Sequence, residues 1–249
     1  MPEMVTPDMA RTQQRDVVAN GVPARLTTYF GSNWTTRGPD APPPPGPEEL
    51  YPMAFLVEQS AETTVQAHYH AANQWQVVVG GGGSLGTHAV APVVVHYTNA
   101  FSSYGPLRSG PQGLHYFTLR NGYDAGAQYV PAGTPRLRQV KRRFREARQV
   151  AGAPDTAAGT DVLIPLAEDG MGALRFRLAP GESAVGPDPA GGLGQFWVVT
   201  AGSLAAEGAT LPPLSLLFVR PEEPAFTATA GTKGAEVLAL QYPRQPAHV

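Results

Sequence analysis

The chain has 249 residues, 42% of them hydrophobic, which is enough to bury a sizeable core in one large domain or two small ones. Its net charge of -2 argues against nucleic-acid binding by bulk electrostatics, and the lack of cysteine excludes disulfides and thiolate metal sites. No apolar segment approaches the length of a membrane span and the first residues lack the apolar core of a signal peptide, so we expect a cytoplasmic protein that binds neither membrane nor nucleic acid.

Residues 1–50 are predicted to form an N-terminal arm that ends in a proline-rich spacer. Residues 41–47 read APPPPGP, a sequence typical of a stiff, extended chain. Beyond the arm, many short apolar segments alternate with the glycines and prolines, of which the whole chain has 28 and 26. This pattern indicates many turns and many strands, so we predict an all-β fold.

The pattern His68-x-His70, followed by Gln74, predicts a metal site on a strand. Side chains two residues apart on a strand point to the same face, and Gln74 keeps that face because its spacing from both histidines is even. Two ring nitrogens and one oxygen donor can hold a divalent metal ion. The alternative is a pair of hydrogen-bonded barrel histidines that bind no metal.

The chain repeats itself at an offset of 121 residues. The equivalent segments are QWQVV at 74–78 with QFWVV at 195–199, LHYFTL at 114–119 with AEVLAL at 235–240, Gly81 with Gly202, and Phe55 and Val57 with Phe176 and Leu178. We therefore expect two copies of one all-β unit. A sheet that closes on itself makes a small barrel able to enclose one ligand.

The repeat predicts the domain boundaries. The first copy covers residues 51–135, a basic linker covers residues 136–160, and the second copy covers residues 161–249. The second copy has Pro189 and Gly191 at the positions of His68 and His70, so we expect it to lack metal ligands. It would be a structural partner of the first copy or a separate binding cavity without metal.

These residues resemble the first motif of the cupin superfamily, which is glycine, five residues, His-x-His, three or four residues, glutamate, six residues and glycine. His68, His70 and Gly81 have this spacing, while Gln74 stands at the position of the glutamate and Glu62 at that of the leading glycine. Two copies in one chain make it similar to a bicupin with a degenerate second domain. The resemblance implies two tandem cupin barrels, each a double-stranded β-helix or jelly roll.

The histidine of the family's second motif has two candidate positions. The repeat places Tyr104 there, opposite Ala225 of the second copy, whereas a different alignment places His115 there. Either residue would supply the last metal ligand or an acid/base group. Tyr104 could instead be a wall of the pocket and His115 a core histidine, and His96 could point inward or outward.

The resemblance implies a metal-dependent enzyme, and we predict a dioxygenase-like one that acts on a small organic acid or a phenolic compound. Its cofactor would be a divalent transition metal (Fe, Mn, Ni or Zn) at His68, His70 and Gln74. The alternative is a non-catalytic small-molecule-binding protein, such as a sensor, a sugar-binding protein or a storage protein. We expect a homodimer, because small barrels often pack through an open sheet face.

Overall fold

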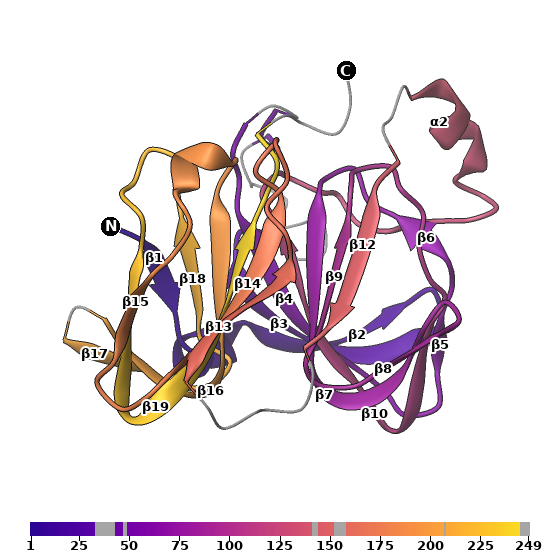
Figure 1. Cartoon of the computed structure of the whole chain (residues 1–249). Coiled ribbons are helices and arrows are strands. Elements are labelled where there is room, and N and C mark those ends of the chain that lie inside the picture. Colours follow the sequence, from indigo (N-terminus) through magenta and orange to yellow (C-terminus); the bar gives the residue numbers. More distant parts are fainter. Residues whose placement is uncertain (33–42, 47–48, 141–143, 152–157, 207, 245–249) are drawn as a thin grey trace. The chain divides into compact units, whose positions relative to one another are not determined.

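The computed structural model describes residues 1–32, 43–46, 49–140, 144–151, 158–206 and 208–244. The chain divides into two compact units, each built on one large sheet (Figure 1). The N-terminal barrel is Gln13–Arg148, and the C-terminal barrel combines Met1–Thr12 with Gln149–Gln245. The helical segments are α1 (Pro7–Ala10), η1 (Arg11–Gln13), α2 (Thr134–Gln139) and η2 (Pro189–Gly191). In the part of the chain that the structure describes, no helix is long and apolar enough to cross a membrane.

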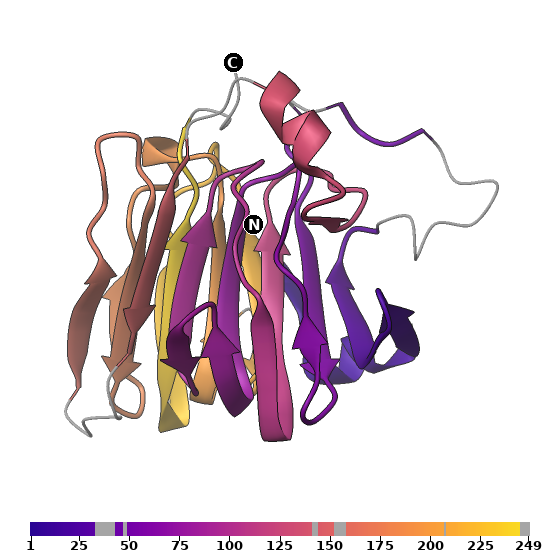
Figure 2. The same ribbon diagram turned by 90° about the vertical axis from the view of Figure 1, so that its right-hand side faces the viewer.

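The N-terminal barrel has a main sheet and a small two-stranded sheet. The order in the main sheet is β12 (Glu146–Val150), β9 (Val94–Thr98), β7 (Gln74–Leu85), β10 (Leu107–Arg120), β4 (Met53–Gln59), β3 (Val22–Phe30) and β2 (Gln14–Ala19). Off this path, β5 (Thr64–Val65) pairs with β10 and β8 (His88–Val90) pairs with β7. The small sheet pairs β6 (His68–Tyr69) with β11 (Gln128–Tyr129), and α2 lies beyond the ends of the long strands of this barrel (Figure 2).

The C-terminal barrel has the same arrangement of long strands. The order is β1 (Glu3–Val5), β18 (Leu216–Val219), β16 (Gln195–Ala206), β19 (Thr227–Gln241), β14 (Gly172–Leu178) and β13 (Gly159–Ile164). Off this path, β15 (Ser183–Val185) pairs with β19 and β17 (Ala209–Leu211) pairs with β16. The prediction of an all-β fold with two jelly-roll barrels is confirmed.

Residues 1–50, expected to form an arm, contribute strands to both barrels. β1 pairs with β18 of the C-terminal barrel, while β2 and β3 extend the sheet of the N-terminal barrel next to β4. The arm was expected because this stretch is polar, but a strand with only one buried face needs few apolar residues. Residues 41–42 and 47 of the proline-rich spacer lie outside the described residues.

Residues 136–160, expected to be a linker, also contain regular structure. Most of α2 falls within them, and β12 pairs with β9 in the sheet of the N-terminal barrel. Residues 141–143 and 152–157 of this range lie outside the described part of the chain.

Strand pairing confirms most of the repeat and corrects one part of it. β7 and β16 begin and end 121 residues apart, and Gln74 pairs with Arg120 as Gln195 pairs with Gln241. The next strands differ, because Arg120 pairs with Met53 whereas Gln241 pairs with Gly172, an offset of 119. Phe55 therefore corresponds to Leu174, and the expected match to Phe176 was wrong. A shift of two residues keeps every side chain on the same face, so the alternating pattern could not reveal it.

The inside of the C-terminal barrel is filled by apolar side chains. Trp197 is fully buried, and its ring stacks on Phe176 with centroids 5.4 Å apart. Leu217, Val219 and Val237 belong to the same buried cluster. Close packing of this kind stabilises the barrel but leaves little room for a ligand.

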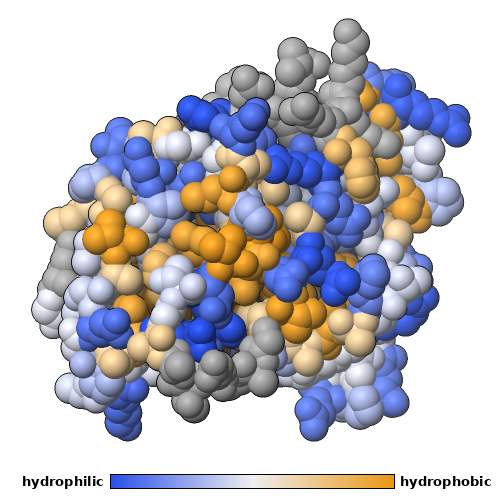
Figure 3. All heavy atoms as spheres, in the orientation of Figure 1, coloured by the Kyte–Doolittle hydropathy of each residue, from blue (hydrophilic) through white to orange (hydrophobic). Residues whose placement is uncertain are grey.

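Some large apolar side chains remain in contact with solvent. In the C-terminal barrel, Val162 on β13 is 60% exposed and Val185 on β15 is 65% exposed. Figure 3 shows hydrophobic residues among hydrophilic ones on the face of the molecule that it draws. Single exposed apolar residues are common on protein surfaces and imply no function by themselves.

Candidate functional site

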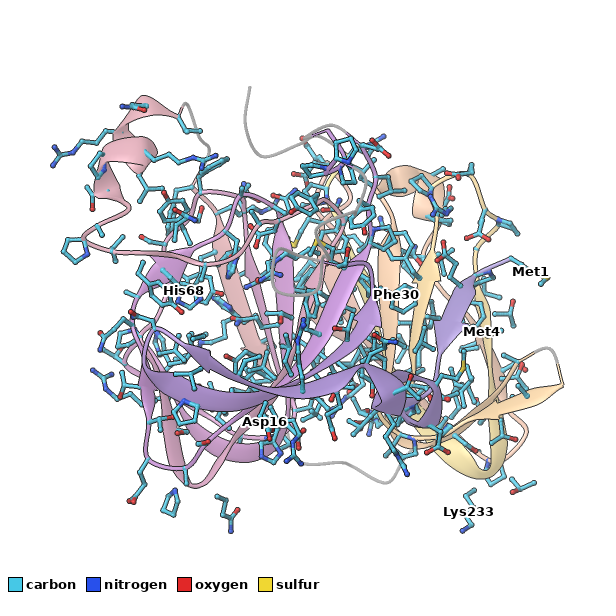
Figure 4. All side chains as sticks on the ribbon, turned by 180° about the vertical axis from the view of Figure 1, so that it is seen from behind. Met1, Met4, Asp16, Phe30, His68 and Lys233 are labelled. Carbon is cyan, nitrogen blue, oxygen red and sulfur yellow. The ribbon has the colours of Figure 1, made fainter. Side chains whose placement is uncertain are left out.

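The N-terminal barrel encloses a cavity of about 290 Å³. Because side chains alternate along strands, one face of β4 and one face of β10 line it. These inward side chains are Phe55, Val57 and Gln59 from β4, and Tyr116, Thr118 and Arg120 from β10. Residues 17–20 of the β2–β3 hairpin also line the cavity, and Figure 4 shows this hairpin, with Asp16, crossing in front of the other strands of the barrel.

His68 lies at one end of this cavity in a chain of hydrogen bonds. Its Nδ1 is 2.7 Å from the carbonyl oxygen of Gln66, and because a carbonyl only accepts, Nδ1 carries the hydrogen. Nε2 therefore accepts a hydrogen bond from the Tyr104 hydroxyl at 2.9 Å, and that hydroxyl accepts one from Nε2 of Gln74 at 2.7 Å. Figure 4 labels His68 among the side chains of this barrel.

The backbone holds His68 and Tyr104 side by side. The N–H of His68 donates to the carbonyl of Tyr104, and the N–H of Tyr104 donates back to the carbonyl of His68. Tyr104 is distant in sequence, so this bridge explains how the two side chains meet. Gln74 is the first residue of β7, and its Oε1 is buried without a hydrogen-bond partner among the described residues.

His70 contacts two charged residues that the sequence analysis did not single out. Its Nδ1 donates to Oδ2 of Asp124 at 2.7 Å, and Nη2 of Arg120 lies 3.2 Å from both of its ring nitrogens. Asp124 also accepts hydrogen bonds from the backbone N–H groups of Ala71 and Gly126. All three side chains are buried, so the guanidinium and the carboxylate balance each other out of contact with water.

Burial determines the charges of this cluster. The pKa of His68 is lowered to about 3, mainly by desolvation and secondly by the neighbouring His70. Desolvation and then Arg120 lower the pKa of His70 as well. Burial alone would raise the pKa of Asp124, but its hydrogen bonds and the Arg120 charge hold that pKa well below its ordinary value. At neutral pH both imidazoles are therefore neutral, while Asp124 is ionised and Arg120 is charged.

Comparison with known proteins identifies the architecture. No family model matches the chain, and no curated protein matches it. Several solved structures share its fold. One is a proposed dioxygenase from Nostoc punctiforme (9% identity, TM-score 0.62, covering 98% of this chain and 83% of that one), and another is nickel-bound pirin YhhW from Escherichia coli (12% identity, TM-score 0.57, covering 98% and 100%). A third is an 11S globulin from Wrightia tinctoria with an auxin binding site (11% identity, TM-score 0.60, covering 98% and 84%). The chain has the bicupin fold. Identities this low show the fold alone.

Four of the five predicted site residues of this bicupin-fold chain lie close together. His68, His70, Gln74 and Tyr104 form one cluster, in which the two imidazole ring centroids are 5.2 Å apart. His115 does not join them. It is half-buried on the face of β10 opposite to Tyr116, and its ring packs against Gly80. The alternation of side chains along β10 therefore places the His115 ring on the face opposite to the inward series, so the structure does not bring it to the other four residues.

Arg120 and Asp124 are the site residues that the sequence analysis missed. Arg120 continues the inward series Tyr116 and Thr118 at a spacing of two, so the strand pattern did contain a signal for it. Asp124 follows in a loop, where no periodicity applies, and only the folded chain brings its carboxylate to His70.

His96 occupies a second buried network beside the cavity. One ring nitrogen is 2.9 Å from Oε1 of Gln76, which lines the cavity, and the other is 3.0 Å from a carboxylate oxygen of Glu146 on β12. Desolvation lowers the pKa of His96, while Glu146 opposes that shift. His96 points inward, although its contacts are with Gln76 and Glu146 rather than with His68.

The expected metal donors are present only in part. Both imidazoles have a hydrogen-bonded Nδ1 and an Nε2 lone pair, which is how proteins orient histidine ligands. However, Arg120 already lies 3.2 Å from His70 Nε2, and a second cation there would be repelled. No group of three or more His, Cys, Asp or Glu that could hold a metal ion occurs among the described residues. The donor set as arranged does not fit a divalent metal ion.

The C-terminal barrel lacks the same polar groups. Pro189 and Gly191 lie in η2, and Gln241 takes the position of Arg120. The amide of Gln195 donates to Oε1 of Gln241 at 2.6 Å, which closes a neutral pair within the barrel. A charged cluster like that of the N-terminal barrel is therefore not repeated at these positions.

Proposed function

We propose that the N-terminal barrel of this bicupin binds a small organic acid or a phenolic compound, with the acidic group of the ligand at Arg120. The observation that carries the proposal is the charge of the cavity. Among the described residues that line it, Arg120 is the only side chain with a permanent charge, and it is 4% exposed. An anion that enters the cavity meets the Arg120 guanidinium on its wall, whereas the Asp124 carboxylate that balances this charge, 3.8 Å from Nε of Arg120, is not among the lining residues.

The neighbouring polar groups favour an anion or a hydroxyl oxygen. Burial lowers the pKa values of His68 and His70, so neither histidine changes charge near neutral pH. Burial also raises the pKa values of the Tyr104 and Tyr116 hydroxyl groups, which therefore stay protonated. Tyr104 donates its hydrogen to Nε2 of His68, so Tyr116 is the hydroxyl that we expect to donate to a ligand. Donors fixed at buried positions in a protein bind an anionic oxygen more strongly than the same donors in water.

The rest of the cavity suits an apolar or aromatic body. Phe55, Val57 and Leu26 line its walls, and Tyr129 contributes another ring. A pocket with mostly apolar walls and a few convergent polar groups is the usual form of a small-molecule site. The 11S globulin with an auxin binding site supports the proposal, because auxin is itself a small aromatic acid.

Calorimetric titration with cinnamate tests this proposal. Arg120→Gln should raise the Kd for cinnamate about tenfold or more, because a buried charged hydrogen bond is worth about 1.5–3 kcal/mol. Arg108→Gln, at an exposed position of the same strand outside the cavity, is the matched control and should leave the Kd unchanged. Equal binding of cinnamate and its neutral amide by the unmodified protein would contradict the proposal, whatever the stability of the Arg120 variant.

A second candidate is the metal-dependent, dioxygenase-like enzyme expected from the sequence, which would require Arg120 to move away from Nε2 of His70 before a metal ion could bind there. Its support is the pair of imidazoles whose Nδ1 atoms are fixed by Gln66 and Asp124, and the nickel ion of the YhhW neighbour. Elemental analysis of untagged protein, before and after incubation with Fe, Mn, Ni and Zn, separates the candidates. Less than about a tenth of an equivalent of bound metal would exclude the metal-dependent enzyme and leave the binding of a small acid as the proposed function.

A homodimer and a cytoplasmic location remain predictions from the sequence. Sedimentation equilibrium of the full chain tests the first, and fractionation of the source cells tests the second.

A further inference from the structure

We infer that the preferred ligand carries a hydroxyl group on the carbon next to its acidic group, and that the Gln76 side chain binds this hydroxyl. The ligand class would be a 2-hydroxy acid with an apolar or aromatic body. This inference rests on the proposed function, because it takes the acidic group to be held at Arg120.

The Gln76 amide is held at one end and open at the other. Its Oε1 lies 2.9 Å from Nδ1 of His96, and Nε2 of His96 lies in turn 3.0 Å from the Glu146 carboxylate. Nε2 of Gln76 makes no hydrogen bond to any of the described residues. This nitrogen is not sealed from solvent, in contrast to the orphaned Oε1 of Gln74. Because Gln76 lines the cavity, its open end is available to a ligand there.

A hydroxyl group suits this amide in either of its orientations. The oxygen and nitrogen of the Gln76 amide exchange places when its terminal group rotates, according to whether Nδ1 of His96 donates or accepts. One end always faces His96 and the other always faces the cavity. A hydroxyl group both donates and accepts, so it pairs with whichever end it meets, whereas a methyl group of similar size pairs with neither.

Gln76 lies close to Arg120 on the cavity wall. In the pairing of β7 with β10, Gln74 is opposite Arg120 and Gln76 is opposite Thr118, so Gln76 and Arg120 are diagonal neighbours. Both side chains line the cavity, and positions related in this way are about 7–8 Å apart along the backbone. Two long side chains at this separation can contact one small ligand at neighbouring atoms. The group that Gln76 binds is therefore next to the acidic group and not at the far end of the ligand.

The C-terminal barrel shows that the fold does not require polar side chains at these positions. Gln76 pairs with His96 in the N-terminal barrel as Trp197 pairs with Leu217 in the C-terminal barrel. Trp197 and Leu217 belong to the apolar cluster that fills the C-terminal barrel. Apolar residues therefore satisfy the fold at both positions, which indicates that the polar pair of the N-terminal barrel serves a ligand.

Titration calorimetry with three aromatic acids at neutral pH tests the inference. One enantiomer of 3-phenyllactate should bind to the unmodified protein about fivefold or more tightly than 3-phenylpropanoate, as expected for one added neutral hydrogen bond. The third acid, 2-methyl-3-phenylpropanoate, has a methyl group in place of the hydroxyl. It should bind about fivefold or more weakly than the favoured enantiomer of 3-phenyllactate.

A variant at Gln76 assigns the preference to this residue. In Gln76→Met the preference for the hydroxyl group should disappear, while 3-phenylpropanoate still binds because Arg120 is unchanged. Gln112→Met, at an exposed position outside the cavity, is the matched control and should keep the preference. A preference that persists in Gln76→Met would show that another residue binds the hydroxyl group.

The outcomes separate this inference from the proposed function. If 3-phenylpropanoate binds and the hydroxyl group adds nothing in either enantiomer, the role of Gln76 is overturned while the acid site at Arg120 stands. If none of the three acids binds to the unmodified protein, both are overturned. The comparison of ligands within the unmodified protein does not depend on how well the Gln76 variant folds.

Discussion

Burial keeps the histidines of the N-terminal barrel uncharged. His68, His70 and His96 are each less than 8% exposed, and desolvation is the main cause that lowers all three pKa values. Neutral rings can accept hydrogen bonds from Tyr104 and Arg120, which a protonated ring could not do. The hydrogen bonds at the polar end of the cavity therefore require the imidazole rings of His68 and His70 to be neutral.

This burial predicts acid sensitivity that begins near pH 6.5. An unfolded histidine binds a proton below that pH, whereas folded His68 binds one only near its pKa of about 3, so the unfolded state gains stability as the pH falls. We expect the free energy of unfolding to fall by up to about 1.4 kcal/mol per pH unit for each such histidine between pH 6 and pH 4. Urea denaturation at a series of pH values measures this dependence.

Two variants identify the source of the acid effect. His68→Asn should reduce the slope, whereas His88→Asn, at an exposed position on β8, should leave it unchanged. Asp124 contributes little above about pH 5, because the stabilising effect of a carboxyl with a depressed pKa is lost only as the pH falls through the ordinary pKa of aspartate and below it. Stability that stays constant from pH 6.5 to pH 4 would show that the histidines are not held neutral.

At the scale of elements, one glycine contact recurs in both barrels. Gly81 and Gly113 have positive φ values, as do Gly202 and Gly234 at the equivalent positions. A Cβ atom added to Gly81 would lie 2.2 Å from the carbonyl oxygen of Gly113, and one added to Gly202 would lie 2.1 Å from that of Gly234. The repeat found in the sequence is therefore a repeat of backbone geometry, where the two longest strands of each barrel change register.

Substitution of these glycines predicts a graded loss of stability. Gly202→Ala combines a positive φ with a clash against backbone and should cost more than about 2 kcal/mol. Gly181→Ala, in the same barrel, has a positive φ but open space around the added Cβ, and should cost about 1 kcal/mol. Equal costs in a chemical denaturation experiment would show that the close approach of the backbones is unimportant.

At the scale of the whole molecule, the N-terminal strand belongs to the barrel formed by the end of the chain. Glu3, Met4 and Val5 pair with Phe218, Leu217 and Leu216. Met4 packs against the core of the C-terminal barrel, and Glu3 forms an ion pair with Arg220. These contacts cover the edge of β18, which would otherwise present unpaired backbone groups.

Removal of Met1–Val5 should therefore destabilise the C-terminal barrel. The loss of a partly buried methionine and one strand pairing should cost about 2 kcal/mol, and amide exchange at Leu216–Val219 should accelerate. Glu3→Gln removes only an exposed ion pair and should cost less than about 1 kcal/mol. Unchanged exchange in the truncated protein would mean that β1 contributes little to this barrel.

The sequence by itself determined the all-β fold, the two copies and the face on which His68, His70 and Gln74 lie. These features follow from local patterns: alternation with a period of two, glycines at positive φ, and an offset that repeats them. The tertiary structure alone decided that Arg120 and Asp124 meet His70, that Gln76 meets His96 and that residues 1–30 divide between two barrels. The physical reason is that these contacts join segments far apart in the chain, and a strand pattern specifies which face a side chain takes but not its partner across the sheet.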